Sequence, residues 1–139
     1  MSYQNLDPDQ ARELIDDGWT YLDVRTEEEF QQGHAPGAYN IPLLFRGAMG
    51  MEANPQFLEQ VGRAFEKDHR LVVACKAGGR SLKACELLEG AGFQALANMD
   101  GGFHGRPDPS GAIVVAGWEA RGLPTTIEAD AGRSHSDLR

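Results

Sequence analysis

The residues best suited to covalent chemistry in this sequence are its two cysteines, Cys75 and Cys85. Cys75 ends an apolar run over residues 71–75 and opens a glycine-bearing loop that precedes a helical pattern. In an open parallel sheet, ligands bind at the carboxyl ends of the strands. A cysteine at such a strand end, just ahead of a helix N-terminus, is well placed to act as a nucleophile.

Three features of the loop after Cys75 favour the thiolate form of that cysteine. Gly78 and Gly79 let the backbone curl so that successive N–H groups point inward as an anion nest. A helix that starts near Arg80 adds positive potential at its N-terminus, and Lys76 and Arg80 add formal positive charge. Because the thiolate is the reactive form of cysteine, we predict that Cys75 is the catalytic nucleophile.

The charge and the length of this loop both indicate which kind of substrate it would bind. Residues 63–83 hold six of the 13 basic residues and only two acidic ones, which favours an anionic substrate. Four residues separate Cys75 from Arg80, whereas protein tyrosine phosphatases place five residues between their cysteine and arginine to cradle a tetrahedral phosphate. A shorter loop makes a tighter cradle, suited to a cysteine that carries one extra sulfur atom.

Cys85 and the histidines are expected to be structural. Cys85 lies in the apolar stripe of a helical segment with only Lys83 as a nearby cation, which is typical of a buried cysteine. A disulfide between the two cysteines is not expected in a reducing compartment. No histidine has metal-ligand spacing with a cysteine, so we predict no metal and no cofactor. We expect His104 in a loop, and His69 and His135 on the surface or in a tail.

The composition describes one acidic globular domain. The chain has 139 residues, 41% hydrophobic and 24% charged, with a formal charge of -8. Such a charge disfavours binding to nucleic acid or to an anionic membrane. No apolar run approaches the length of about 20 residues that a membrane-spanning helix needs. Residues 1–10 are polar and acidic rather than a signal peptide, and two cysteines make no disulfide framework, so we predict a cytoplasmic protein.

Helical and strand-like patterns alternate along the chain, which predicts an α/β domain with a largely parallel sheet. Asp7, Thr26 with Glu29, and Asn54 are expected to cap helices. We predict a domain over residues 1–127 with an excursion at about 103–117, and a flexible tail over 128–139. The predicted helices cover 7–18, 26–32, 54–65, 81–90 and 118–121, and the predicted strands cover 20–24, 71–75 and 94–98.

Four motifs in this order make the chain resemble a single-domain rhodanese over about residues 5–126. They are Leu22-Asp23-Val24-Arg25-Thr26 with Glu29-Phe30, Gly33-His34-Ala35-Pro36-Gly37-Ala38 with Asn40-Ile41-Pro42, Cys75 to Ser81, and Gly101-Gly102 with Trp118 and Gly122-Leu123-Pro124. The resemblance implies a central, mostly parallel five-stranded sheet flanked by helices on both faces. It also implies that Cys75 takes a sulfane sulfur from a small anionic donor such as thiosulfate. The resulting persulfide would pass that sulfur to cyanide, a small thiol or a protein thiol.

The resemblance also assigns roles around the loop. Backbone N–H groups would stabilise the persulfide, Arg80 and Lys76 would orient the donor's sulfonate oxygens, and Ser81 would contact the sulfur or cap the helix. Asp23, Arg25 and Glu29 would fix loops, and His34 would hydrogen-bond backbone. The implied substrate-binding residues are Lys76, Ala77, Gly78, Gly79, Arg80 and Ser81.

One departure from the family pattern leaves the donor and acceptor open. Residues 103–117 intervene between the double glycine and Trp118, and Phe103, Ile113, Val114 and Val115 are expected to form a substrate rim or a partner surface. Besides a sulfurtransferase enzyme, the same residues fit a persulfide carrier that serves partner proteins. A phosphatase or arsenate reductase is disfavoured by the loop length, and an inert binding domain by the nucleophile.

Overall fold

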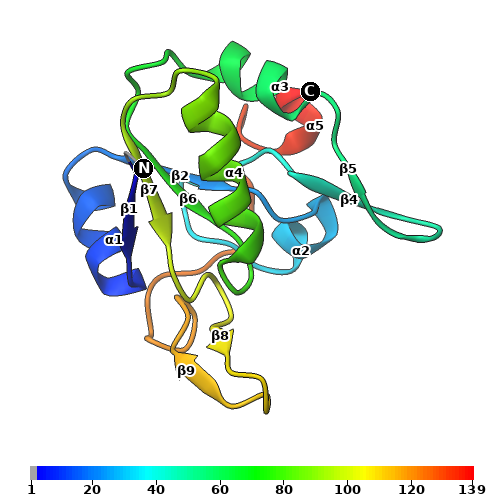
Figure 1. The fold of residues 1–139 in the computed structure, drawn as a ribbon. Coiled ribbons are helices and arrows are strands. Elements are labelled where there is room, and N and C mark those ends of the chain that lie inside the picture. Colours follow the sequence, from blue (N-terminus) through cyan, green and yellow to red (C-terminus); the bar gives the residue numbers. More distant parts are fainter. Residues whose placement is uncertain (1–2) are drawn as a thin grey trace.

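A five-stranded sheet forms the centre of the protein, in a computed structural model that describes residues 3–139. Its strands lie in the order β1-β7-β6-β2-β3, and every neighbouring pair is parallel, which confirms the predicted α/β fold (Figure 1). Leu71, Val73 and Cys75 belong to the core on one face, while Val72 and Ala74 belong to the core on the other. The strands are β1 (Gln4–Leu6), β2 (Thr20–Asp23), β3 (Tyr39–Asn40), β6 (Leu71–Ala74) and β7 (Leu96–Met99).

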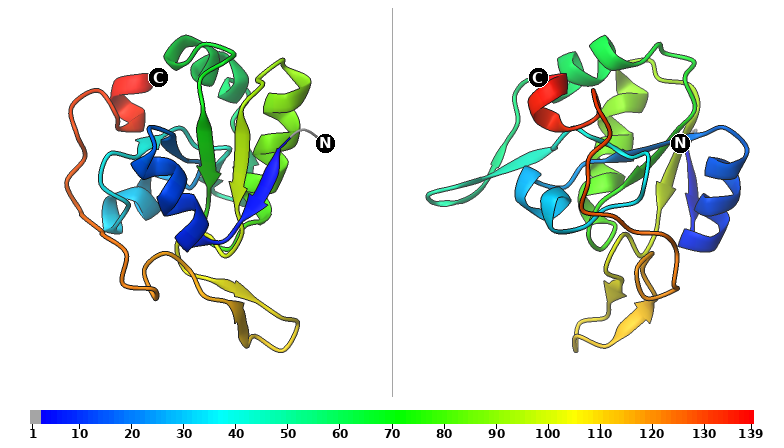
Figure 2. Two further views of the ribbon diagram at one scale, coloured as in Figure 1. Left: turned by 90° about the vertical axis from the view of Figure 1, so that its left-hand side faces the viewer. Right: turned by 180° about the vertical axis from the view of Figure 1, so that it is seen from behind.

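Helices cover both faces of this sheet (Figure 2). On one face lie α1 (Pro8–Asp16) and α2 (Glu27–Gln32), and on the other lie α3 (Phe57–Ala64) and α4 (Gly79–Gly90). Within residues 3–139, no helix is both long and apolar enough to cross a bilayer.

The predicted helix caps are correct at two of the three positions. Asp7 and Thr26 each form a capping box, the latter with Glu29. Asn54 does not cap α3. Its side chain instead donates to the carbonyl oxygen of Pro42 and to Oε1 of Gln60, at 2.8 and 3.0 Å, and the helix begins only at Phe57.

Two antiparallel hairpins project from the domain (Figures 1 and 2). The first joins β4 (Leu44–Gly47) to β5 (Gly50–Ala53) and was not predicted. The second joins β8 (Arg106–Pro107) to β9 (Ile113–Val115) and forms the predicted excursion.

The helix predicted over 118–121 is wrong, because these residues form a turn. Trp118 donates its backbone N–H to Gly102 and its indole N–H to the carbonyl oxygen of Pro124, at 2.9 and 2.6 Å. Its side chain is buried and meets the ring of Tyr21 edge-on. These contacts hold the chain in this turn, and a helix over the same residues would break them.

The segment over 128–139 differs from the expected flexible tail. The N–H of Asn40 in β3 donates to the carbonyl oxygen of Arg133 at 2.9 Å, and α5 (His135–Leu138) lies close to α3 (Figure 1). His135 is 3% exposed and pairs with Glu27, so its predicted surface position is wrong. Backbone hydrogen bonds and polar contacts hold this segment in place. Such contacts require no regular spacing of apolar residues, so no pattern in the sequence predicts them.

Candidate active site

The sulfur of Cys75 lies at the floor of a short loop between β6 and α4. Its Sγ accepts a hydrogen bond from the backbone N–H of Gly78 at 3.1 Å. Gly78 is the N-cap of α4 and has a φ of 121°, a conformation that favours glycine. Cys75 is 1% exposed, so its sulfur is shielded from bulk water.

The first turn of α4 faces this sulfur. Gly79, Arg80 and Ser81 begin the helix, and the first N–H groups of a helix have no acceptor within it. Ser81 is buried, and its Oγ lies 3.5 Å from Sγ of Cys75 while donating to the carbonyl oxygen of Gly78 at 3.1 Å. Of the two roles weighed for Ser81, the structure therefore shows contact with the sulfur.

The start of the loop is fixed by the segment that follows β7. Phe103 donates its N–H to the carbonyl oxygen of Cys75 at 2.8 Å, and His104 does the same to Lys76 at 2.9 Å. This close approach requires Gly102, which has a φ of 57° and whose added Cβ would lie 2.5 Å from the oxygen of Cys75. In the sequence the double glycine is recognisable only as a family motif, and its close contact with the backbone of Cys75 and Lys76 is seen only in the structure.

The end of the loop is fixed by an ion pair between Glu29 and Arg80, which we call the Glu29–Arg80 clasp. The two terminal nitrogens of Arg80 contact the two carboxylate oxygens of Glu29 at 2.6 and 3.0 Å. Burial alone would raise the pKa of Glu29, but hydrogen bonds from Arg80 and from the backbone of Thr26 outweigh it and lower that pKa to about 2. Glu29 therefore occupies the two terminal nitrogens of Arg80, the residue that was expected to orient a donor's sulfonate.

Asp23 and Arg25 form a second ion pair, which is buried. Arg25 donates to both carboxylate oxygens of Asp23 and to the carbonyl oxygen of Gly33, the last at 2.7 Å. Its guanidinium lies 4.4 Å from the ring centre of Phe103. The contact with Gly33 matches the predicted role of this pair in fixing loops. Phe103 is 2% exposed, so the prediction that it forms a rim or partner surface is wrong.

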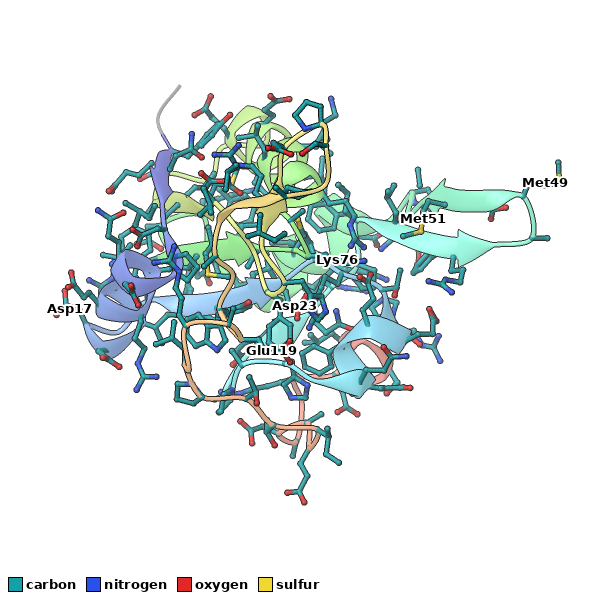
Figure 3. The ribbon with its side chains drawn as sticks, turned by 90° about the horizontal axis from the view of Figure 1, so that it is seen from below. Asp17, Asp23, Met49, Met51, Lys76 and Glu119 are labelled. Carbon is teal, nitrogen blue, oxygen red and sulfur yellow. The ribbon has the colours of Figure 1, made fainter. Side chains whose placement is uncertain are left out.

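Other predicted residues occupy the positions expected of them. The ring nitrogens Nδ1 and Nε2 of His34 lie 2.7 and 3.1 Å from the carbonyl oxygens of Phe30 and Glu128, as predicted for a histidine that binds backbone. Ile113 and Val114 are exposed on the β8–β9 hairpin. Lys76 is exposed on the face at which β6 and β7 end, where the β4–β5 hairpin with Met49 and Met51 projects to one side (Figure 3).

Cys85 differs from Cys75 in its place in the fold, because it lies within α4 and not in the loop before it. It is fully buried in α4, and burial, with the nearby charges of Glu89, Cys75 and Glu86, raises its pKa to about 12. Both cysteines are free. Across residues 3–139, no group of three or more His, Cys, Asp or Glu residues is arranged to hold a metal ion.

The fold and this loop define a class of protein, an α/β domain in which a cysteine lies in a short loop between a strand and a helix, with a backbone N–H directed at its sulfur. A family profile described as "Rhodanese-like domain" matches residues 7–105, and the chain belongs to that family. The predicted resemblance is thereby confirmed.

Relatives and solved structures agree with this membership. The chain is 45% identical over 115 residues to "Thiosulfate sulfurtransferase 16, chloroplastic" of Arabidopsis thaliana, covering 83% of this chain and 86% of that protein. It is 44% identical over 100 residues to "Protein HIGH ARSENIC CONTENT 1, mitochondrial" of the same plant, covering 72% of this chain and 59% of that protein. The crystal structure of Rv0390 from M. tuberculosis matches with a TM-score of 0.76 at 27% identity, covering 91% of this chain and 100% of that one.

The names of these relatives overturn the prediction of a cytoplasmic protein. Two of them are named chloroplastic and mitochondrial, and a third, "Rhodanese-like domain-containing protein 15, chloroplastic" of Arabidopsis thaliana, is 43% identical over 93 residues. Unpaired cysteines indicate a reducing compartment without saying which one. The cytoplasmic prediction is therefore wrong.

Proposed function

We propose that the protein is a sulfurtransferase that moves a sulfane sulfur from an anionic donor such as thiosulfate to a thiophilic acceptor through a persulfide on Cys75. Relatives named "Thiosulfate sulfurtransferase 16" and "Thiosulfate sulfurtransferase 18", the latter 40% identical over 101 residues, support the activity in general. The observation that carries the proposal is the hydrogen bond from the N–H of Gly78 to Sγ of Cys75, at 3.1 Å.

In this proposal, the sulfur is transferred in two steps. The Cys75 thiolate attacks the outer sulfur of thiosulfate, the sulfur–sulfur bond of the donor breaks, and sulfite leaves with the bonding electron pair. The enzyme then carries a Cys75 persulfide anion. Cyanide or a thiolate attacks the outer sulfur of that persulfide, and the departing electron pair restores the Cys75 thiolate. No external oxidant or reductant is needed.

The residues of the loop divide this work. The backbone N–H groups of residues 76–80 lie at the N-terminal end of α4, where they stabilise the negative charge of the persulfide. Ser81, 3.5 Å from Sγ, can turn its hydroxyl from the Gly78 carbonyl toward the sulfur when the sulfur is anionic. Lys76 is an exposed residue of the loop and attracts the donor's oxygens as a point charge.

The test is mass spectrometry of the protein after exposure to thiosulfate. We expect a gain of one sulfur atom, located on the peptide that contains Cys75 and removed by cyanide with formation of thiocyanate. Cys75→Ser should abolish both the gain and the turnover, while Cys85→Ser should keep them. Equal loss in the two variants, or a sulfur found on Cys85, would overturn the assignment.

A further inference from the structure

The loop that carries Cys75 is held at both ends by segments far away in the sequence. At its start, the carbonyl oxygens of Cys75 and Lys76 accept the N–H groups of Phe103 and His104. At its end, Arg80 is held by Glu29, 51 residues earlier in the chain. The N–H of Gly78, which points at Sγ, lies between these two anchors.

Glu29 is itself held rigidly. Its Oε1 accepts hydrogen bonds from the backbone N–H and the hydroxyl of Thr26, both at 3.1 Å, as part of the capping box of α2. The side chains of Glu29 and Arg80 are each 17% exposed, so the ion pair between them is partly desolvated. The clasp therefore ties the first turn of α4 to the first turn of a helix on the opposite face of the sheet.

The geometry of the clasp also occupies the terminal edge of the Arg80 guanidinium. A guanidinium recognises a sulfonate or carboxylate by two parallel N–H bonds from one edge. Nη1 and Nη2 of Arg80 both contact Glu29, at 2.6 and 3.0 Å. Lys76, by contrast, is an exposed residue of the loop.

We propose that Glu29 and Arg80 are positioning residues, which aim the N–H of Gly78 at the Cys75 sulfur, and that Lys76 rather than Arg80 determines the preference for anionic donors. This rests on the proposed sulfur transfer. Loss of the clasp should lower kcat, because the amide is misaligned in the reacting complex. Loss of Lys76 should raise KM, because only donor binding is weakened.

The experiment compares variants with two donors, thiosulfate and methanethiosulfonate, the second of which carries one negative charge fewer. Glu29→Gln and Arg80→Lys should each lower kcat about tenfold or more for both donors, with KM changed by less than about threefold. Arg80→Lys keeps the charge and loses the fork, so a residue acting only by charge would tolerate it. Lys76→Ala should raise KM more for thiosulfate than for methanethiosulfonate.

Two controls isolate the clasp. Glu28→Gln removes the same charge from an exposed neighbour in α2 and should leave kcat unchanged. The double variant Glu29→Gln with Arg80→Lys should be no slower than the worse single variant, because both changes break one interaction.

Hydrogen exchange at the Gly78 amide gives a readout that does not depend on activity. We expect it to exchange about tenfold faster in Glu29→Gln and Arg80→Lys than in the wild type or Glu28→Gln. Wild-type kcat in Arg80→Lys together with a raised KM for thiosulfate would overturn the proposal, as would unchanged exchange. If the wild type gains no sulfur from thiosulfate, the proposed function fails, and the exchange rates still decide whether the clasp exists.

Discussion

Replacing Gly102 by alanine should disable the site without touching any residue proposed to react. A Cβ at this position would lie 2.5 Å from the carbonyl oxygen of Cys75 and 2.6 Å from that of Lys76. Ordinary contact begins near 3.4 Å, so the loop backbone has to move by about 0.9 Å. A shift of that size in reacting groups costs on the order of a hundredfold in rate, and this is the expected fall in kcat.

Gly122→Ala is the matched control for this prediction. Gly122 has a φ of 74°, close to the 57° of Gly102, but its added Cβ would meet nothing within 4 Å. Backbone strain alone should cost about 1 kcal/mol in each variant. Overpacking should add about 2 kcal/mol to Gly102→Ala only, which lowers its melting temperature by about 6 °C more than the control.

The assay is thiocyanate formation from thiosulfate and cyanide, normalised to folded protein, with calorimetry of both variants. The difference between the two variants in kcat and melting temperature measures the effect of the steric overlap with the Cys75–Lys76 backbone. If Gly102→Ala keeps the kcat and melting temperature of Gly122→Ala, the idea that residues 101–104 fix the loop is refuted.

Three further predictions concern titration and buried charge. With a pKa of about 12, Cys85 has a thiolate fraction below about one in a thousand at pH 8.5, so iodoacetamide should leave it unmodified in the folded protein, as peptide mass spectrometry would show. The lowered pKa of Glu29 stabilises the fold above about pH 4.5, and this stabilisation is lost as pH falls toward 2. Glu29→Gln should therefore reduce the free energy of unfolding by about 2 kcal/mol at pH 7, with the gap closing near pH 2 in urea titrations; a pH-independent gap would contradict it. Arg25→Met leaves Asp23 buried without its cationic partner and should lower the free energy of unfolding by about 3 kcal/mol in urea titrations, most of which Asp23→Asn should recover in the double variant.

Local signals in the sequence predicted the elements that build the site. The capping box of Thr26 and Glu29 depends on residues three apart, and the structure has it as predicted. The strand over 71–75 followed from a short run with β-branched residues, and β6 ends one residue earlier. Such features depend on neighbours in the chain, so composition and spacing are enough to find them.

The contacts that fix the loop could not be predicted in this way. Glu29 and Arg80 lie 51 residues apart, and no pattern in the sequence around either residue predicts that they pair. Sequence reasoning grouped Glu29 with Asp23 and Arg25, while the structure gives Glu29 a different partner. Phe103 was expected at the surface because it begins an insertion, yet it is buried over the guanidinium of Arg25. Tertiary packing decides both cases.

The pairing of residues 126–133 with the edge of the sheet has a consequence for how copies of the protein behave toward one another. β3 is the last strand of the sheet on its side, and its backbone would otherwise be open. The carbonyl oxygen of Arg133 accepts the N–H of Asn40, and Thr126 exchanges two backbone hydrogen bonds with His34 just before this strand. An open edge strand is a template for aggregation, so this stretch of chain keeps folded molecules from pairing through the β3 edge at high concentration.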